Sequence, residues 1–394
     1  MSKEVILVIN AGSSSIKYKV FDKQSDQVLA SGQCEKIANP MGIFSIKING
    51  KEDVVELPIP NHSVGIKKML DELKNKNVIS SLDEIKGIGH RVVMGGRKYD
   101  QSIVIDDDVL KVLTEYIPLA PLHNPPEIDT IKEFQKMLPN VKNIAVFDTS
   151  FHTSIPAVNN YALNQETVKK YGIYRYGMHG TSYRYITQHV QSILNKKDLN
   201  LIICHIGNGA SMCCVKNSKS YDTTMGFTPL DGLVMGTRCG NADPSIALFL
   251  IRQGWTADQV DNMFNKQSGL KGFTGKNDFR DVNELASQGN EDAKLVIDMF
   301  INRVANYIAW YANELENKID AIIFTAGVGE NSNNTVKTII NKAKVLNLTI
   351  DDNAFNNKYS DYRLVSTSSS QVPVYQVRTD EELMIEQDVK SLAK

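Results

Sequence analysis

The sequence predicts an α/β protein built from two copies of one unit, and two features carry that prediction. An apolar run at 5–9 meets a small polar turn at 10–15 and continues with alternating polarity over 16–20. The segment 201–215 repeats the same plan. Strand and helix periods alternate after each copy. We therefore expect mixed sheets flanked by helices, with a ligand cleft between the two halves.

Each repeated segment has the pattern of a β-hairpin whose tip is rich in Gly, Ser and Asn. Such a tip exposes several backbone N–H groups, which suits close contact with phosphate oxygens. Two ordinary hairpins are the alternative, because these residues also occupy turns for local reasons. Neither turn is followed by a helical period, so the sequence argues against a P-loop and against a dinucleotide fingerprint.

The elements of the first half follow in order. Apolar and β-branched runs predict strands up to about residue 48, and later segments alternate in type. Pro125 and Pro126 mark a helix start, and the strand that follows ends on a carboxylate, Asp148. That position is common for ligand-binding groups in α/β sheets. The predicted segments are a helix at 64–73, a strand at 85–93, a helix at 126–138 and a strand at 143–149.

The second half begins again with the hairpin at 201–215. A third strand at 220–224, a long amphipathic helix at 292–316 and a buried strand from 319 follow. This last strand ends in a third glycine turn at 327–331, which precedes helical residues 336–346. The order of elements therefore matches a duplicated unit.

Composition limits the function classes. A chain of 394 residues is long enough for two domains, and 44 basic against 45 acidic side chains give no case for nucleic acid or membrane partners. No apolar run approaches the roughly 20 residues that span a bilayer, and the start leads into a strand rather than a signal peptide. Five cysteines without a CxxC pair favour a reducing, cytoplasmic setting and no zinc site.

Nine ordered motifs resemble those of the acetate kinases, within the acetate and sugar kinase/heat-shock 70/actin superfamily. They cover essentially the whole chain and are Asn10-Ala11-Gly12-Ser13-Ser14-Ser15, Gly89-His90-Arg91-Val92-Val93, Pro121-Leu122-His123-Asn124-Pro125, Phe147-Asp148-Thr149, His179-Gly180-Thr181-Ser182, His205-Ile206-Gly207-Asn208-Gly209, Met235-Gly236-Thr237-Arg238-Cys239-Gly240, Asp278-Phe279-Arg280 and Gly327-Val328-Gly329-Glu330-Asn331.

The resemblance implies two ribonuclease H-like (actin-like ATPase) domains, at 1–148 plus 382–394 and at 149–381. It implies reversible transfer of the ATP γ-phosphoryl group to acetate by direct in-line displacement, giving acetyl phosphate and ADP. Mg²⁺ is the expected cation, with Mn²⁺ as an alternative, and a homodimer is expected. Phosphoryl transfer needs positioning and positive charge rather than covalent chemistry.

The same resemblance assigns roles to individual residues. Asn10 and Glu381 would place Mg²⁺, a hard cation that prefers oxygen ligands. Lys17 and the 205–209 turn would hold the nucleotide phosphates, and the adenosine side would lie at 278–280 and 327–331. The expected nucleotide-binding residues are Lys17, His205, Ile206, Gly207, Asn208, Gly209, Asp278, Phe279, Arg280, Gly327, Val328, Gly329, Glu330 and Asn331.

Two arginines suit the chemistry because a guanidinium matches carboxylate and phosphoryl oxygens bidentately. By resemblance Arg91 binds the acetate carboxylate, while Arg238 and His179 stabilise charge on the transferring phosphoryl group. Asp148 is the family's acid/base residue. Acetate is already ionised near neutral pH, however, so Asp148 is expected to hold Mg²⁺ through water and to orient the reactants.

An apolar recess for the substrate methyl group is expected from Val93, Leu122, Met178 and Pro229. Met178 stands where the family usually has an aromatic residue, and methionine is adaptable, so one more carbon could fit. An added methylene changes binding by only about 1 to 3 kcal/mol, which leaves acetate and propionate unseparated. Met94 and Tyr183 depart from the usual histidines, and the loop at 274–277 is slightly short.

Two rivals remain open at the level of sequence. One is a propionate or butyrate kinase on the same scaffold. The other is an actin-like ATPase that uses nucleotide as a conformational switch. Such a switch needs no acyl pocket, so Arg91, His179 and Arg238 argue against it.

Overall fold

The computed structural model describes residues 3–121 and 123–394, which form two compact units. The first unit contains the chain up to Phe151 together with Asp380–Lys394, and the second contains His152–Thr379. Leu122, expected in the acyl recess, lies outside the described residues. The chain re-enters the first unit at Asp380, so Glu381 belongs to the first unit. The boundary expected from the sequence had placed Glu381 in the second domain.

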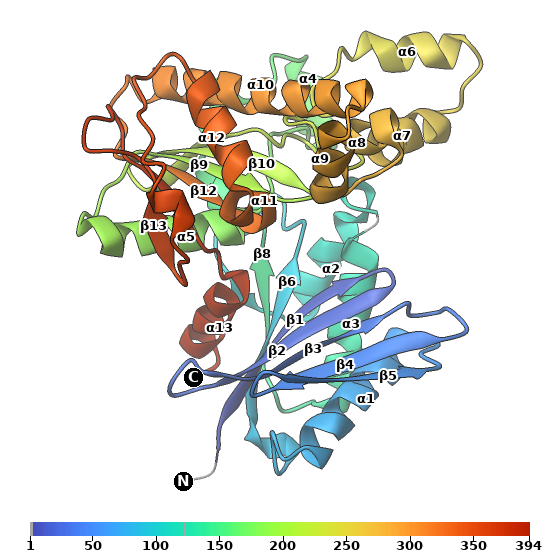
Figure 1. Ribbon diagram of the computed structural model, residues 1–394. Helices are drawn as coiled ribbons and strands as arrows, with labels where there is room; N and C mark the ends of the chain where they lie inside the picture. Colours follow the sequence, from blue (N-terminus) through green and yellow to red (C-terminus); the bar gives the residue numbers. More distant parts are fainter. Residues whose placement is uncertain (1–2, 122) are drawn as a thin grey trace. The chain divides into compact units, whose positions relative to one another are not determined.

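The first unit is built on an eight-stranded mixed sheet with the order β5-β4-β3-β2-β1-β6-β8-β7 (Figure 1). Strands β1 to β5 form consecutive antiparallel pairs, and β6 and β8 join β1 in parallel. The strands are β1 Val5–Gly12, β2 Ser15–Asp22, β3 Val28–Glu35, β4 Gly42–Ile48, β5 Lys51–Leu57, β6 Ile85–Val92, β7 Ile103–Val104 and β8 Asn143–Phe147.

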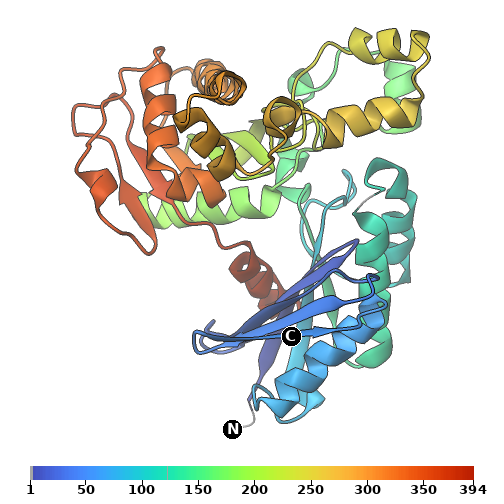
Figure 2. The same cartoon turned by 45° about the vertical axis from the view of Figure 1, so that its right-hand side comes forward.

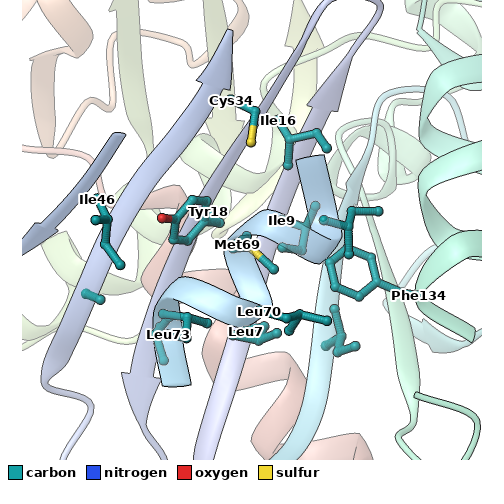
Figure 3. Packing of buried hydrophobic residues seen from close by; sticks show 14 of the residues in the cluster. Leu7, Ile9, Ile16, Tyr18, Cys34, Ile46, Met69, Leu70, Leu73 and Phe134 are labelled. Carbon is teal, nitrogen blue, oxygen red and sulfur yellow. The ribbon is translucent and has the colours of Figure 1, made fainter. Parts of the chain in front are cut away.

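Helices cover both faces of this sheet. Successive residues of a strand point to opposite faces, and those of the central strand β1 are apolar and buried on both. Helices α1 (His62–Asn75) and α3 (Asn124–Met137) lie on one face, and α2 (Asp107–Glu115) packs beside α3 (Figure 2). Apolar residues of α1 and α3 meet Leu7, Ile9 and Tyr18 in one buried cluster (Figure 3), whereas those of α2 belong to a second cluster. Burial of such clusters is the main favourable term in folding.

The C-terminal helix α13 (Glu381–Leu392) covers part of the opposite face. It packs so closely on β6 that a β-carbon at Gly89 would lie 2.3 Å from Ile385 Cγ2, and one at Gly87 would lie 2.4 Å from Val389 Cγ1. Two glycines are therefore required where the helix crosses the strand. This packing sets the position of Glu381 at the start of the helix.

The second unit repeats the topology. Its six-stranded sheet has the order β11-β10-β9-β12-β14-β13, in which β9 to β11 are antiparallel and β12 and β14 join β9 in parallel. The central arrangement matches β3-β2-β1-β6-β8, which confirms the predicted duplication. The strands are β9 Leu201–Ile206, β10 Ala210–Lys216, β11 Lys219–Thr223, β12 Ala321–Thr325, β13 Tyr362–Leu364 and β14 Val374–Val377.

The helices of the second unit also lie on both faces of its sheet. The longest, α10 (Glu291–Glu314), lies on one face, and α5 (Gly180–Leu194) lies on the other (Figure 1). The remaining helices are α4 Gln165–Tyr171, α6 Ser245–Arg252, α7 Ala257–Lys266, α8 Gly269–Thr274, α9 Phe279–Ser287, α11 Ala326–Asn331 and α12 Asn333–Lys342.

One local prediction was wrong. The glycine segment after β12 was expected to be an open turn, but it forms the short helix α11. Ala326 adopts a left-handed φ of 64°, which turns the chain sharply after the strand, and the Ala326 N–H donates to Glu330 Oε1 at 2.9 Å. This side chain closes the first turn as a cap would. Across the described ranges, no helix combines the length and apolar character needed to cross a bilayer.

Candidate active site

Arg91 and Asp148 form a bidentate ion pair in the first unit. They lie at the carboxyl ends of the neighbouring parallel strands β6 and β8, an edge where ligand groups gather in α/β sheets. Arg91 Nε donates to Asp148 Oδ1 at 3.1 Å and Nη2 to Oδ2 at 2.7 Å. Burial alone would lower the pKa of Arg91, but the Asp148 and Glu381 carboxylates outweigh burial and raise it. The guanidinium therefore stays charged.

Glu381 approaches the same arginine from α13. Its Oε2 lies 3.9 Å from Arg91 Nε. Burial raises the pKa of Glu381 to about 7, against the opposing effect of Arg91. Its neighbours Asp380 and Glu382 both bind Lys19 Nζ, at 3.4 and 3.2 Å, which fixes the start of the helix on strand β2. Two carboxylates thus face one guanidinium.

Glu127 is a third carboxyl group near this pair, and the sequence analysis missed it. It is 3% exposed, and its Oε2 accepts a hydrogen bond from the Val93 N–H at 3.2 Å. Burial raises its pKa to about 8. An acidic residue in the first turn of a helix is ordinary, because it complements the helix dipole, so the sequence carried no signal of burial. Glu127 fixes the backbone of the expected acyl-pocket residue Val93.

Asn10 and Lys17 are direct partners across β1 and β2. Both line a hollow of about 270 Å³ on the sheet, together with Lys19, Gln33 and Glu382 among others. No cluster of three or more acidic, histidine or cysteine side chains suited to a metal occurs in the part of the chain that is described. Mg²⁺ bound together with substrate phosphates needs only one or two carboxylates, and the donors Asn10 and Glu381 fit that mode.

His179 caps α5 in the second unit. Its backbone is left-handed, with φ 60°, which a non-glycine residue rarely adopts and which marks a constrained position. The ring Nδ1 lies 2.8 Å from Ser211 Oγ, and the ring stacks on His205 with centroids 4.2 Å apart and planes 17° from parallel. Neighbouring contacts therefore fix the orientation of the imidazole.

Arg238 faces the same region from the loop after Pro229. Its Nη1 donates to the Pro229 carbonyl at 3.3 Å, and burial lowers its pKa. A β-carbon at Gly209 would lie 3.7 Å from His179 Nε2 and 3.8 Å from Arg238 Nη1. The two side chains thus converge on the tip of the β9–β10 hairpin. A hollow of about 160 Å³ opens beside it, lined by Asn208, Gly209, Met235, Gly236, Thr237, Arg238 and Asn277.

The segments predicted to hold the nucleotide meet in the second unit. The Gly236 N–H donates to Asn208 O at 3.1 Å, and a β-carbon on Gly236 would lie 2.6 Å from Asn277 O. Asp278 caps α9 and pairs with Arg280, whose Nη2 lies 2.7 Å from Asp278 Oδ2. These Arg280 hydrogen bonds lower the pKa of Asp278 to about 2.

Two residues in these segments have structural partners. The Phe279 ring is buried and packs edge-on against Phe300, with centroids 5.2 Å apart, so it offers no exposed face to a base. Glu330 accepts the N–H of Thr379 at 3.1 Å in addition to that of Ala326, and Arg378 Nη1 lies 3.2 Å from its Oε2. Its carboxylate ties α11 to the end of the second unit.

The 327–331 segment nevertheless lies beside the 205–209 turn, because β9 and β12 are parallel neighbours with Thr325 paired to His205. A β-carbon on Gly207 would be 4.0 Å from Ala326 Cβ, and Gly327 faces open space. The structure therefore brings His205, Ile206, Gly207, Asn208 and Gly209 to the same sheet edge as Gly327, Val328 and Gly329.

The predicted residues divide between the units. The first unit holds Asn10, Lys17, Arg91, Val93, Asp148 and Glu381, and the second holds Met178, His179, the 205–209 turn, Pro229, Arg238, the 278–280 segment and the 327–331 segment. Met178 is 3% exposed and precedes His179, and its carbonyl accepts a hydrogen bond from His152 Nε2 at 3.0 Å.

Known proteins resemble this chain over nearly its whole length. The family model of the acetokinase family matches residues 5–387. An acetate kinase of Mycoplasmoides gallisepticum is 48% identical over 99% of both chains.

Solved structures agree in fold. An acetate kinase structure from Porphyromonas gingivalis has a TM-score of 0.93 at 36% identity, covering 99% of this chain and 100% of that one. A propionate kinase structure from Francisella tularensis has a TM-score of 0.93 at 40% identity, with the same coverage. The chain belongs to the acetokinase family.

Proposed function

We propose that this chain is an ATP:acetate phosphotransferase that interconverts acetate and ATP with acetyl phosphate and ADP. The observation that carries the proposal is the placement of two arginines on different sheet edges, each with partners that fix its direction. Arg91 is held by Asp148, and Arg238 faces the Gly209 tip with His179. Full-length similarity to acetate kinases supports the substrate.

In the first unit, Arg91 would bind the acetate carboxylate. Both Asp148 oxygens accept hydrogen bonds from Arg91, so Asp148 orients the guanidinium. Acetate brings no proton at neutral pH, which removes the need for a base. Asn10 and Glu381 would hold Mg²⁺, with Asp148 acting through water; when bound, the cation neutralises charge on the β- and γ-phosphates. Mn²⁺ offers the same oxygen-ligand chemistry.

In the second unit, backbone N–H groups of the 207–209 turn would bind the phosphates together with Lys17 of the first unit. Arg238 and His179 would stabilise negative charge on the transferring phosphoryl group, where preorganised donors have their largest effect. The 278–280 and 327–331 segments would hold the adenosine. For Phe279 and Glu330 the contact would come from the backbone, because their side chains are engaged elsewhere.

The acyl recess expected from the sequence would take the methyl group of a small acid. Val93 contributes from the first unit, Met178 and Pro229 from the second, and Leu122 completes the set proposed from sequence. A propionate kinase is the second candidate, because the propionate kinase of Francisella tularensis is 40% identical and Met178 is a flexible wall. Comparison of kcat/KM for acetate, propionate and butyrate decides between them. If kcat/KM is higher for propionate or butyrate than for acetate, that acid replaces acetate as the proposed substrate.

Trapping with hydroxylamine tests the activity itself. Purified protein with ATP, Mg²⁺ and acetate should give acetyl hydroxamate in step with ADP. ADP formed at the same rate without acetate, and without hydroxamate, would support a nucleotide switch and contradict the proposal. We also expect the enzyme to be cytoplasmic, because its co-substrate ATP is available there.

We propose in addition that the chain forms a homodimer through its second unit. Helix α6 has no buried residue, and Ile246, Leu248, Phe249 and Ile251 are all exposed, with Phe249 57% exposed. An apolar helix of this kind is normally covered by a partner. Phe249→Asp should halve the mass measured by light scattering. An unchanged dimer mass would exclude α6 from the interface, and a monomeric parent protein would refute the dimer.

A further inference from the structure

The Nδ1 atom of His179 is linked by hydrogen bonds to two hydroxyl groups, first that of Ser211 and then that of Tyr183. Tyr183 lies one turn further along α5, and its backbone N–H donates to His179 O at 3.0 Å. The Tyr183 hydroxyl makes a short hydrogen bond to Ser211 Oγ, which in turn lies 2.8 Å from His179 Nδ1. Tyr183 and Ser211 are both fully buried. The three groups thus form one chain from the core to the imidazole.

The chemistry of the groups sets the direction of these hydrogen bonds. A phenol, with a pKa near 10, is a much stronger acid than an aliphatic hydroxyl, and imidazole nitrogen is the most basic atom of the three. Hydrogen bonds in series polarise one another, so the chain is strongest when each donor points toward the imidazole. Tyr183 then donates to Ser211, and Ser211 donates to Nδ1 of His179.

This direction fixes which ring nitrogen carries the proton. With its Nδ1 lone pair occupied as an acceptor, a neutral His179 carries its hydrogen on Nε2. Nε2 is the atom that lies 3.7 Å from the β-carbon position of Gly209, beside Arg238 Nη1. The donor therefore points to the place where the proposed phosphoryl group develops charge.

We propose that Tyr183 is a positioning residue that acts through Ser211 to keep His179 as an Nε2–H donor aimed at the Gly209 tip. That the Nε2–H faces a transferring phosphoryl group rests on the proposed function. The hydrogen-bond chain itself does not depend on that function. It also gives a role to a tyrosine that departs from the family's usual histidine.

A purely structural role for Tyr183 is the alternative. Its ring packs edge-on against His152 and His205, with centroids 5.6 and 6.1 Å away. Phenylalanine would keep these ring contacts and remove only the hydroxyl. Tyr183→Phe therefore separates the two roles.

The test is a double-mutant cycle with Tyr183→Phe and Ser211→Ala. Tyr183→Phe should lower kcat for acetyl phosphate formation about five- to tenfold, the effect of losing roughly one hydrogen bond, with little change in KM for acetate. In the Ser211→Ala background the same change should have no further effect, because the connection is already cut. Equal losses in both backgrounds would overturn the proposal.

Tyr311→Phe is the matched control. Tyr311 is also fully buried in the second unit, but its hydroxyl has no hydrogen-bond partner among the residues that the structure describes. Removing that hydroxyl should leave kcat unchanged. If Tyr183→Phe behaves like Tyr311→Phe, the hydroxyl of Tyr183 has no role in positioning.

A direct reading of the tautomer needs no activity. Protein labelled with ¹⁵N-histidine at pH 8 should show His179 in the Nε2–H form, assigned by loss of its signals in His179→Gln. Tyr183→Phe should mix the tautomers. An Nδ1–H form in the unmutated protein would overturn the inference even if a variant fails to fold. Absence of acetyl hydroxamate with the expected tautomer would instead refute the proposed function.

Discussion

Gly209→Ala places a methyl group between the two side chains that are proposed to hold the transferring phosphoryl group. The new β-carbon would lie 3.7 Å from His179 Nε2 and 3.8 Å from Arg238 Nη1, which are ordinary van der Waals distances. Gly209 is not among the residues with positive φ, so alanine fits its backbone. The protein should fold, with a gain of about 0.4 to 1 kcal/mol from the stiffer unfolded chain.

The effect on catalysis should be large because the methyl group occupies the space of an oxygen. An oxygen bound to both donors would lie about 2.8 to 3.0 Å from each nitrogen, and on the Gly209 side of them it would collide with a carbon at the new position. Displacement on the order of 1 Å costs about 10²-fold in rate. We expect kcat to fall by about that factor, measured as hydroxamate formation at saturating ATP and acetate.

Gly327→Ala provides the contrast. Its β-carbon would meet nothing within 4 Å, in the first turn of α11 at the same sheet edge. That change should act mainly on KM for ATP and leave kcat within about threefold, since uniform binding affects KM rather than turnover. A Gly209→Ala enzyme with unimpaired kcat would refute the placement of the phosphoryl group between His179 and Arg238.

Three further changes test other parts of the account. Asp148→Asn should raise the Mg²⁺ concentration for half-maximal rate as well as lower turnover; an unchanged Mg²⁺ response with lost turnover would count against Asp148 holding Mg²⁺ through water. Val93→Ala should shift the kcat/KM ratio toward propionate by about five- to tenfold, as one methylene of space allows; a shift toward acetate would exclude Val93 from the recess. Glu386 is fully buried, with Lys390 Nζ 3.3 Å from its Oε1, and burial raises its pKa to about 7. Because its folded-state pKa exceeds the unfolded value, its stability contribution decreases as pH rises from about 4.5 to 7. Glu386→Gln should raise the urea midpoint at pH 8 by more than at pH 5; equal shifts would contradict it.

The fold was predictable because the duplicated hairpins carry a local signal. An apolar run, a small polar turn and renewed alternation determine β1–β2 and β9–β10 without any long-range information. The helix at 326–331 was not predictable, because its first turn depends on a left-handed alanine and on the Glu330 side chain. Gly327 and Gly329 lie within five residues of each other just after the strand, and local sequence rules predict a turn from such a segment.

The candidate site was predictable in its residue types but not in its contacts. Arg91, Asp148 and Arg238 followed from motifs, whereas their partners follow from tertiary packing. Burial of Glu127 behind Val93 depends on how α3 lies on the sheet, and no periodicity encodes that. The link from Tyr183 through Ser211 joins a helix to a strand, so only the folded chain shows it.

Oxygen transfer from acetate to phosphorus tests the central claim most directly. Acetate labelled with ¹⁸O in both carboxylate oxygens, incubated with ATP, Mg²⁺ and the protein, should give acetyl phosphate whose ³¹P resonance shows the isotope shift of one bridging ¹⁸O. That result means that a carboxylate oxygen attacks the γ-phosphorus, as the roles of Arg91 and Arg238 require. Acetyl phosphate without ¹⁸O at phosphorus, or ADP formation with no labelled product, would contradict the account.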